Sequence, residues 1–319
     1  MSIKILVTGG AGYIGNVLVP ALLQAGPNFE VTVLDNLIHR QSAIMQNCRN
    51  KRFQFVYGDV RNQELYKKLI SENDYIVNLA AYVGMPLCKR FPVETVQVNK
   101  ESAEFLAKNV SQSQRVIHAM TNSGYGLGQH VEGKAVHCTE ESPLKPISLY
   151  GETKVAAENA LMQNGNCTSL RFATVMGVSP KMRMDLLVND FTYKAWNDRY
   201  IVLFESTFLR NFIHIRDASE AIYHAISNFS MKGQTYNVGN TSANVNKMDL
   251  CLAIKKHVPD FYITESPINK DPDQRNYVVS NAKLEATGWE PRFSLDHTIQ
   301  EVLKACPIIK NSNVVFSDI

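Results

Sequence analysis

Few cysteines occur in the sequence, and their spacing excludes several classes of protein. The 319 residues include six cysteines, and no two of them form a C-x-x-C pair. Zinc knuckles and small disulfide frameworks need closely spaced cysteines, so neither is expected. We therefore expect no metal site and a reducing compartment, the cytoplasm.

The sequence also lacks a long apolar run, a long basic run and any internal repeat. A membrane-spanning helix needs about 20 consecutive apolar residues, and no stretch approaches that length. The net charge is only +3, with acidic and basic residues interspersed. Neither nucleic acid nor a membrane is therefore an expected partner. A hydrophobic share of 45% over this length predicts a full core and about two domains.

A glycine-rich segment near the start of the chain predicts a phosphate-binding turn. The branched apolar residues 3–7 predict a buried strand, and Gly9, Gly12 and Gly15 follow it before a helical pattern. Glycine allows backbone conformations that a Cβ forbids, and the N–H groups at a helix start bind phosphate. A second register, which begins at Gly10, fits G-x-G-x-x-G equally well.

An acidic residue at a fixed distance makes this turn more specific. Residues 31–34 predict a second buried strand that ends at Asp35, twenty residues after Gly15. A carboxylate at this distance binds the ribose hydroxyls of a dinucleotide. The carboxylate of Asp35 should also repel the 2′-phosphate of NADP. Arg40 is the only nearby residue in the sequence that would instead favour NADP. We therefore predict NAD rather than NADP as the cofactor.

Strands and helices alternate up to residue 120, which predicts an α/β fold with a Rossmann-type doubly wound parallel sheet. Ligands bind such sheets beyond the carboxyl ends of the strands. We expect an NAD-binding domain at residues 1–178, to which 209–238 return. A smaller mixed substrate domain is expected at 179–208 and 239–319. Asp59, which follows the third strand, fits either an adenine contact or an ordinary turn, and spacing does not separate the two.

Tyr150 and Lys154 form a Y-x-x-x-K pair after the fifth strand. Residues four apart share one face of a helix, so the phenol and the ammonium can meet at one point. A neighbouring cation favours phenolate, which can take the proton of a substrate hydroxyl while hydride leaves the same carbon. Thr121 would hydrogen-bond the same oxygen. Alone, a Y-x-x-x-K pair is a common coincidence. It can equally be an aromatic residue that packs against the core beside a solvated lysine.

The glycine segment, Asp35, Thr121, Tyr150 and Lys154, in this order, resemble the extended short-chain dehydrogenase/reductase superfamily, which includes the nucleotide-sugar epimerases and dehydratases. The resemblance spans nearly the whole chain and favours the register that begins at Gly9. It implies that Tyr150 is the base, that Lys154 also binds the nicotinamide ribose, that Thr121 assists, and that the protein is a homodimer. The expected NAD contacts are Gly9, Gly12, Tyr13, Ile14, Gly15, Asp35, Asn36, Asp59, Val60, Leu79, Ala80, Ala81, Asn99, Tyr150 and Lys154.

In this family the region beyond residue 178 binds the nucleotide sugar. The resemblance places Asn189 and Arg210 at positions that hold the nucleotide and its diphosphate. Arg275 is a further candidate, because a planar guanidinium binds two phosphate oxygens at once. For Arg183, a solvated surface position is nearly as good an interpretation. The expected substrate contacts are Val83, Thr121, Asn122, Ser123, Arg183, Asn189, Arg210 and Arg275.

The residues beside Thr121 discriminate among the reactions of the family, which share oxidation at C4 of the sugar. The 4,6-dehydratases of this pattern carry Thr-Asp-Glu, whereas Asn122 and Ser123 stand here and neither ionises. Dehydration is therefore not expected. The 3,5-epimerising relatives carry a cysteine in place of Ser123, so that reaction is also disfavoured. Net oxidation and epimerisation at C4 remain, and the sequence does not separate them.

Residues 81–90, 121–126 and 183–190 most resemble enzymes that oxidise GDP-heptose at C4 in bacterial capsule biosynthesis. The leading hypothesis is NAD-dependent oxidation of GDP-D-glycero-D-manno-heptose to the 4-keto sugar. A nucleotide-sugar 4-epimerase is the alternative. A non-catalytic dinucleotide sensor could use the same fold. The intact Thr121, Tyr150 and Lys154 argue against a sensor.

Overall fold

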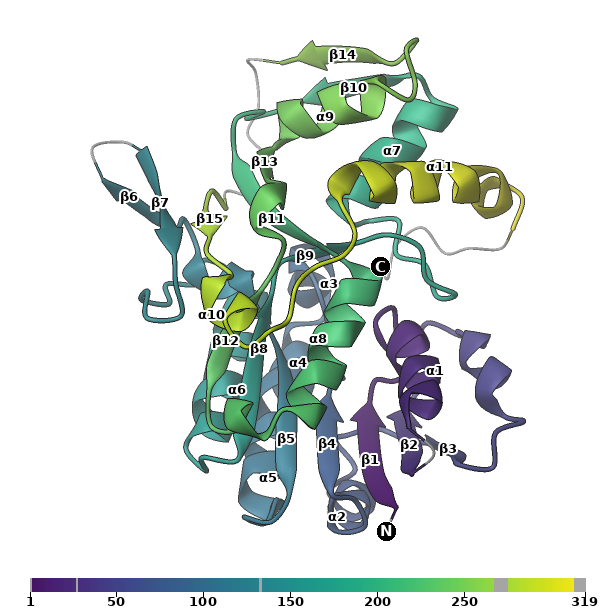
Figure 1. Cartoon of the computed structure of the whole chain (residues 1–319), viewed down its shortest axis with the longest axis vertical. Helices are drawn as coiled ribbons and strands as arrows, with labels where there is room; N and C mark the ends of the chain where they lie inside the picture. The colour runs from purple at the N-terminus through teal and green to yellow at the C-terminus, as the bar shows by residue number, and fades with distance from the viewer. Residues whose placement is uncertain (1, 27, 132–133, 267–274, 313–319) are drawn as a thin grey trace.

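A seven-stranded sheet forms the centre of the protein in a computed structural model that describes residues 2–26, 28–131, 134–266 and 275–312 (Figure 1). Its order is β12-β8-β5-β4-β1-β2-β3, and all neighbouring strands are parallel. This confirms the predicted Rossmann-type sheet. The strands are β1 (Ile3–Thr8), β2 (Phe29–Asp35), β3 (Phe53–Tyr57), β4 (Tyr75–Asn78), β5 (Arg115–Thr121), β8 (Cys167–Phe172) and β12 (Thr235–Val238).

Helices cover both faces of this sheet because the side chains of its strands alternate between two buried clusters. On β1, Ile5 and Val7 pack with α1 (Gly15–Ala25) and α8 (Ile215–Ser227), whereas Leu6 packs with the helices of the other face. Those helices are α2 (Gln63–Ser71), α5 (Ser102–Asn109) and α6 (Leu149–Met162). Shorter helices lie between these elements: η1 (Ala43–Asn47), α3 (Met85–Arg90), α4 (Pro92–Thr95), η2 (Val96–Glu101), η3 (Asn122–Tyr125) and η4 (Phe229–Met231).

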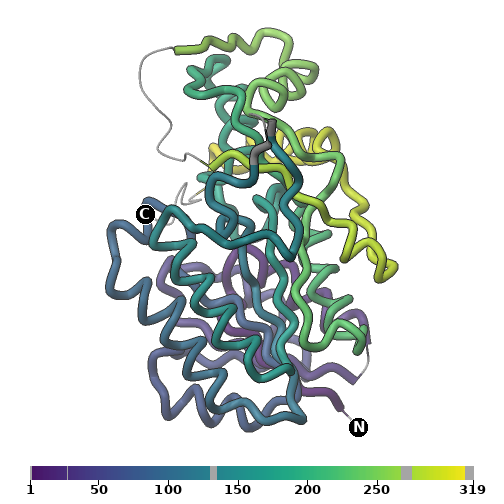
Figure 2. The backbone as a smooth tube through the Cα atoms, turned by 90° about the vertical axis from the view of Figure 1, so that its left-hand side faces the viewer, coloured from purple at the N-terminus to yellow at the C-terminus, as the bar shows by residue number. Residues whose placement is uncertain are grey.

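A smaller region stands over the carboxyl edge of the sheet, at the top of Figures 1 and 2. It contains three short sheets: β13-β11-β9, β10-β14 and β15-β7-β6. Its strands are β6 (Gln129–Val131), β7 (Lys134–Cys138), β9 (Thr174–Met176), β10 (Tyr200–Leu203), β11 (Leu209–His214), β13 (Asn244–Asn246), β14 (Tyr262–Glu265) and β15 (Val278–Val279). Its helices are α7 (Leu187–Asn197), α9 (Lys247–Lys255), α11 (Leu295–Lys310) and η5 (Thr241–Ala243). The short helix α10 (Ala282–Glu285) lies beside β12 of the main sheet. The chain re-enters the main sheet at β12.

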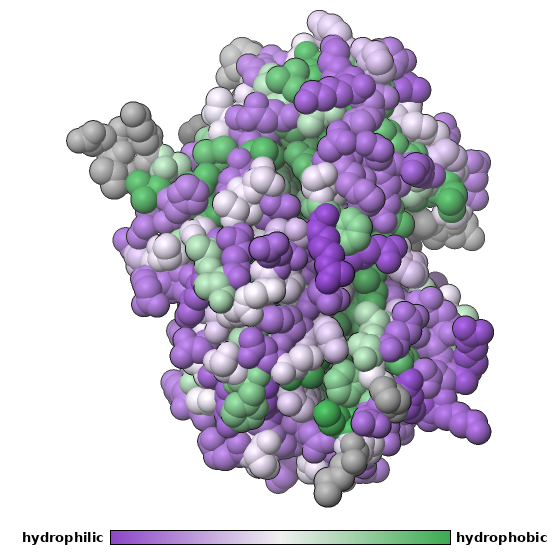
Figure 3. All heavy atoms as spheres, viewed as in Figure 1, coloured by the Kyte–Doolittle hydropathy of each residue, from purple (hydrophilic) through white to green (hydrophobic). Residues whose placement is uncertain are grey.

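Hydrophilic residues cover much of the face in Figure 3, with hydrophobic residues in small groups between them. Within the described part of the chain, no helix combines the length and the hydropathy of a membrane span.

A buried ion pair joins α6 to β8. The guanidinium of Arg171 contacts the carboxylate of Glu158 through Nη2 and Oε2 at 2.8 Å and through Nε and Oε1 at 3.1 Å. Their side chains are only 8% and 3% exposed. Arg171 also donates to the hydroxyl of Tyr125 at 3.0 Å, so the pair fixes α6 against the segment that follows β5. Each buried charge depends on the other, because a lone charge in this position would lose its solvation without compensation.

Replacing Glu158 with Gln should lower the free energy of unfolding by about 3 kcal/mol, because it leaves the Arg171 charge buried and unpaired. Urea unfolding measures this loss. Glu152→Gln is the matched control, since Glu152 is an exposed acid on the same helix and should cost less than about 1 kcal/mol. Equal stability of the two variants would show that the buried pair does not hold α6.

Candidate active site

A cavity of about 290 Å³ lies where the carboxyl ends of the main strands meet the smaller region. Its wall draws on the segments after β1, β2, β3 and β4, the end of β5, the start of α6 and two loops of the smaller region. The cavity therefore brings together residues from distant parts of the chain. The residues predicted from the sequence that line it are Gly9, Gly12, Tyr13, Ile14, Gly15, Asp35, Asn36, Asp59, Val60, Leu79, Ala80, Ala81, Val83, Thr121, Tyr150, Arg183 and Arg275.

The glycine turn fits tightly against the end of β4. Gly9 has a φ of +68°, and a Cβ at this position would lie 2.8 Å from both N and Cα of Ala80. Gly10 is not among the residues with positive φ and does not line the cavity. The tight turn therefore belongs to Gly9, as the register Gly9, Gly12, Gly15 requires. Helix α1 begins at Gly15, which directs the N–H groups of its first turn towards the cavity.

Asp35 connects the end of β2 to the same turn. Its Oδ2 accepts the N–H of Ala11 at 3.0 Å, and its Oδ1 accepts the N–H of Leu37 at 2.8 Å. Burial raises the pKa of Asp35, although these two N–H groups oppose the rise. The carboxylate thus lies in the wall of the cavity, beside the turn and at the position expected for a ribose contact.

The sequence allowed two interpretations of Asp59, an adenine contact or an ordinary turn, and the structure has features of both. It lines the cavity, and its Oδ1 also accepts the N–H of Arg61 at 2.9 Å in a local turn. The guanidinium of Arg61 forms a 2.8 Å ion pair with Asp59 and lowers its pKa to about 2. Asn36 donates to the same carboxylate at 2.8 Å, so Asp59 and Asn36 form one polar part of the wall.

Tyr150 and Thr121 meet at the other end of the cavity. Ser148 caps α6 by accepting the N–H of Gly151 at 3.2 Å, which places Tyr150 in the first turn. Thr121 lies beside the side chain of Tyr150 and opposes the rise in the pKa of the phenol that burial causes. Thr121 in turn donates to the hydroxyl of Ser123 at 3.1 Å. The hydroxyl of Thr121 is thus bonded to Ser123, and the phenol of Tyr150 lies beside it in the cavity wall.

The sequence predicts that Lys154 lowers the pKa of Tyr150, and the charges around the phenol differ from that prediction. Burial raises the pKa of Tyr150, and the cation that opposes this rise most is Arg183. Lys154 is itself only 4% exposed, and burial lowers its pKa to about 8 despite the carboxylate of Glu158. The sequence pattern did not reveal that α6 buries Lys154 and leaves Tyr150 partly buried in the cavity wall.

Six of the predicted residues do not line the cavity: Lys154, Asn99, Asn122, Ser123, Asn189 and Arg210. Asn99 lies behind the wall, where its amide exchanges hydrogen bonds with N and O of Tyr82 at 2.8 and 2.9 Å. Asn122 is fully buried and makes no side-chain hydrogen bond to a described residue. Ser123 accepts a hydrogen bond from Arg275. This packing therefore does not support direct contact between a ligand and either Asn99 or Asn122.

The two remaining residues are also buried. Arg210 is 3% exposed, donates to the carbonyl of Leu209 at 2.9 Å and lies over the ring of Tyr277, with Cζ 5.9 Å from its centroid. Asn189 is 0% exposed and is occupied by hydrogen bonds within the chain. Asn189 was predicted to contact the substrate, whereas its amide bonds the backbone of Gly177 and Arg183 and does not line the cavity.

Lys181 and Tyr277 line the cavity but were not predicted from the sequence. The charge of Lys181 reaches Asp35, where it helps to stabilise the carboxylate. Their signal was present: Lys181 and Arg183 are two residues apart, as are Arg275 and Tyr277, and such spacing puts side chains on one side of an extended segment.

A family model described as NAD dependent epimerase/dehydratase family matches residues 5–239. The low-salt glycan biosynthesis protein Agl12 of Haloferax volcanii is 26% identical over 313 residues, which cover 95% of this chain and 96% of that protein. A UDP-glucose 4-epimerase of Halalkalibacterium halodurans is 25% identical and covers 93% of both chains. A trifunctional UDP-glucose 4,6-dehydratase, 3,5-epimerase and reductase of Arabidopsis thaliana is 25% identical over 94% of this chain, which spans only 47% of the plant protein.

Solved structures share the fold. The UDP-glucose 4-epimerase of Thermus thermophilus, in complex with NAD, matches with a TM-score of 0.78 and 25% identity over 96% of this chain and 99% of that one. The UDP-glucose 4-epimerase of Thermotoga maritima, with UDP-glucose, has a TM-score of 0.82 at 23% identity and covers 97% and 100% of the two chains.

Replacing Gly9 with Ala should weaken NAD binding by roughly tenfold or more, because the new Cβ overlaps the backbone of Ala80 in the cavity wall. Gly165→Ala is the matched control. Gly165 has a φ of +67° but nothing within 4 Å of its Cβ position. Both variants carry a conformational cost of about 1 kcal/mol, and only the first narrows the cavity. Calorimetric NAD titration should show unchanged affinity for Gly165→Ala; equal weakening in both variants would contradict the close approach.

Lys154 should make the stability of the NAD-free protein depend on pH. Its pKa is about 8 in the fold and 10.5 as a free side chain, so the unfolded chain binds more protons between these values. Its contribution to the free energy of unfolding therefore rises with pH across this window, by about 3 kcal/mol. Urea unfolding should show that any stability advantage of Lys154→Met over the wild type shrinks by this amount between pH 8 and 10.5. A difference that is constant with pH would rule out a depressed lysine pKa.

Proposed function

Because the chain belongs to the NAD-dependent epimerase/dehydratase family, we propose that it oxidises the C4 hydroxyl of a nucleotide-linked sugar to a ketone. One observation carries the proposal: Tyr150 and Thr121 share a cavity with the glycine turn and Asp35. When bound, NAD supplies the acceptor for the hydride that leaves C4. The protein supplies the base and the binding geometry.

Tyr150 takes the proton of the C4 hydroxyl in this proposal. The charge of Arg183 favours the phenolate form, and Thr121 also lowers the pKa of the phenol. Lys154 lies one helical turn beyond Tyr150 and does not line the cavity, so its contact with the nicotinamide ribose is proposed from the family resemblance alone. Tyr150 and Thr121 both border the cavity, so a sugar hydroxyl placed between them reaches both oxygens.

The glycine turn and Asp35 fit the other parts of NAD. The absence of a Cβ at Gly9 leaves the backbone open beside Ala80, and the first turn of α1 suits the pyrophosphate. Asp35 binds the ribose hydroxyls and disfavours a 2′-phosphate. Arg40, the opposing signal for NADP, is exposed and does not line the cavity. Equal affinity for NADP would refute this assignment.

Two arginines near Tyr150 support a nucleotide diphosphate as the second ligand. Arg183 and Arg275 both lower the pKa of Tyr150, whereas Lys181 lies towards Asp35. Cations suit the diphosphate, because guanidinium groups bind phosphate oxygens in pairs. Ser123 is occupied by Arg275 and neither it nor Asn122 ionises, so no acid and base for dehydration stand beside Thr121.

The sugar and the fate of the ketone define two candidates. We favour GDP-D-glycero-D-manno-heptose and release of the 4-keto sugar for surface polysaccharide synthesis, on the basis of residues 81–90, 121–126 and 183–190. A 4-epimerase that returns hydride to a rotated ketone is the second candidate. The observation that favours it is the resemblance to relatives named UDP-glucose 4-epimerase. A homodimer remains an expectation drawn from the family.

Product analysis tests the proposal and separates these candidates. The protein is incubated with NAD and either GDP-D-glycero-D-manno-heptose or UDP-glucose, and the sugar is followed by NMR. A released 4-keto heptose supports the favoured reaction, whereas clean conversion to a C4 epimer replaces it with the alternative. Tyr150→Phe should lower kcat by roughly 10²- to 10⁴-fold with NAD affinity retained, because it removes only the base. An undiminished rate in this variant would exclude Tyr150 as the base.

A further inference from the structure

Residues 177–185, here called the strap, contribute to the cavity wall between Asp35 and Tyr150. Lys181 lies towards Asp35, and Arg183 lies towards Tyr150. The Nη2 atom of Arg183 is 3.8 Å from the position that a Cβ on Gly84 would take, so the guanidinium packs against the segment after β4. The strap therefore contributes a lysine and an arginine to the described part of the wall.

Asn189, in the first turn of α7, bonds both ends of the strap. Its Oδ1 accepts the N–H of Gly177 at 3.0 Å, and its Nδ2 donates to the carbonyl of Arg183 at 2.9 Å. The same Nδ2 lies 3.3 Å from the hydroxyl of Tyr13, which donates to the carbonyl of Gly177 at 2.6 Å. The buried amide of Asn189 thus links two points of the strap to each other and links the strap to the glycine-rich segment.

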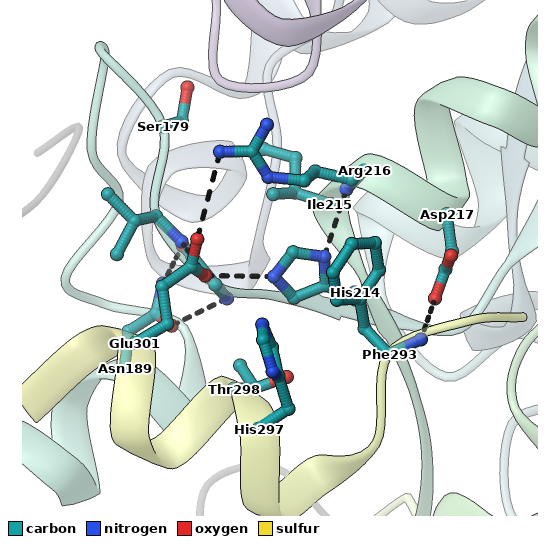
Figure 4. Close-up of polar contacts among 12 residues, drawn as sticks. Ser179, Asn189, His214, Ile215, Arg216, Asp217, Phe293, His297, Thr298 and Glu301 are labelled. Atoms are coloured by element: carbon teal, nitrogen blue, oxygen red, sulfur yellow. Dashed lines mark hydrogen bonds and ion pairs between the residues drawn. The ribbon is translucent and has the colours of Figure 1, made fainter.

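Other contacts fix the start of the strap from the opposite side (Figure 4). The N–H of Val178 donates to Oε2 of Glu301 at 3.1 Å, and Glu301 also contacts Nε2 of His214 at 2.8 Å. The hydroxyl of Ser179 donates to the carbonyl of Tyr13 at 2.8 Å. Glu301 and Ser179 therefore hold residues 177–179 in place, whereas Asn189 bonds the backbone carbonyl of Arg183.

We propose that Asn189 is a positioning residue that holds Arg183 where it binds the nucleotide sugar beside Tyr150. This inference rests on the proposed function for the identity of the ligand. Asn189 itself is 0% exposed and does not line the cavity, so it acts through Arg183.

The two ends of Arg183 need separate supports. Asp185 holds the guanidinium, with Nε to Oδ1 at 3.1 Å and Nη2 to Oδ2 at 2.5 Å. Asn189 holds the backbone from which that side chain projects. An arginine has much rotamer freedom to lose, and fixing its backbone and its head before the ligand arrives lowers the cost of binding. Loss of the Asn189 amide would free the backbone of Arg183 and displace both partners of the ion pair.

A double-mutant cycle with Asn189→Leu and Arg183→Met tests the inference. Each single variant should raise KM for the nucleotide sugar by roughly tenfold or more, with a smaller change in kcat, since a charge-assisted contact to the ligand is lost. The double variant should be no worse than Arg183→Met alone. Calorimetric titration with UDP and with GDP should show the same pattern in dissociation constants, and this readout needs no turnover. Asn189→Asp replaces the donor to the Arg183 carbonyl with an acceptor in nearly the same volume, and it serves if the leucine variant does not fold.

Asn166→Leu is the matched control. Asn166 is 1% exposed and donates to the carbonyls of Ser111 and Gln114 at 2.9 and 3.1 Å, beside the amino end of β8 and far from the cavity. It should lower the melting temperature as Asn189→Leu does but leave KM unchanged.

Full additivity of the Asn189 and Arg183 effects, or an unchanged KM in the Asn189 variants, would overturn the inference. A wild-type protein that binds UDP or GDP but turns over no nucleotide sugar would instead refute the proposed function, while the binding cycle still tests Asn189.

Discussion

The contact on which the site depends is the approach of the glycine turn to the end of β4. With no Cβ at Gly9, the turn packs directly on the backbone of Ala80, and Asp35 fastens it from the other side through the N–H of Ala11. Parallel strands direct all their carboxyl ends to one edge, so this packing also sets the distance between the turn and the residues after β5. The position of Tyr150 relative to a bound dinucleotide follows from that distance.

The sequence was sufficient to predict elements with strong periodicity or fixed spacing. The parallel sheet, the tight turn at Gly9 and the convergence of Asp35, Thr121 and Tyr150 on one cavity all follow from patterns that are local or repeated. A buried strand has a composition that few other elements share, and the carboxyl edge of such a sheet is a geometric consequence of its topology.

Tertiary packing decided what the sequence could not predict. The strap has no periodic pattern, so nothing in the chain indicated that Asn189 would turn its amide towards Gly177 and Arg183 instead of a ligand. Lys181 was missed although its two-residue spacing from Arg183 is visible in the sequence. The pKa of Tyr150 depends on how deeply α6 is buried, and burial outweighs the cations that the Y-x-x-x-K pattern emphasises. Substrate residues are thus harder to predict than cofactor residues, because they lie on irregular segments of the smaller region.

Hydride transfer from C4 is the central claim, and deuterium labelling tests it most directly. A nucleotide sugar deuterated at C4 is mixed with NAD-loaded protein, and after a single turnover the nicotinamide and the sugar are analysed by mass spectrometry. The account predicts that deuterium moves from C4 to the nicotinamide in the wild type and stays on the sugar in Tyr150→Phe. Two results would contradict hydride transfer from C4. In one, the sugar is converted while the deuterium stays at C4 throughout the reaction; in the other, the deuterium is lost to water.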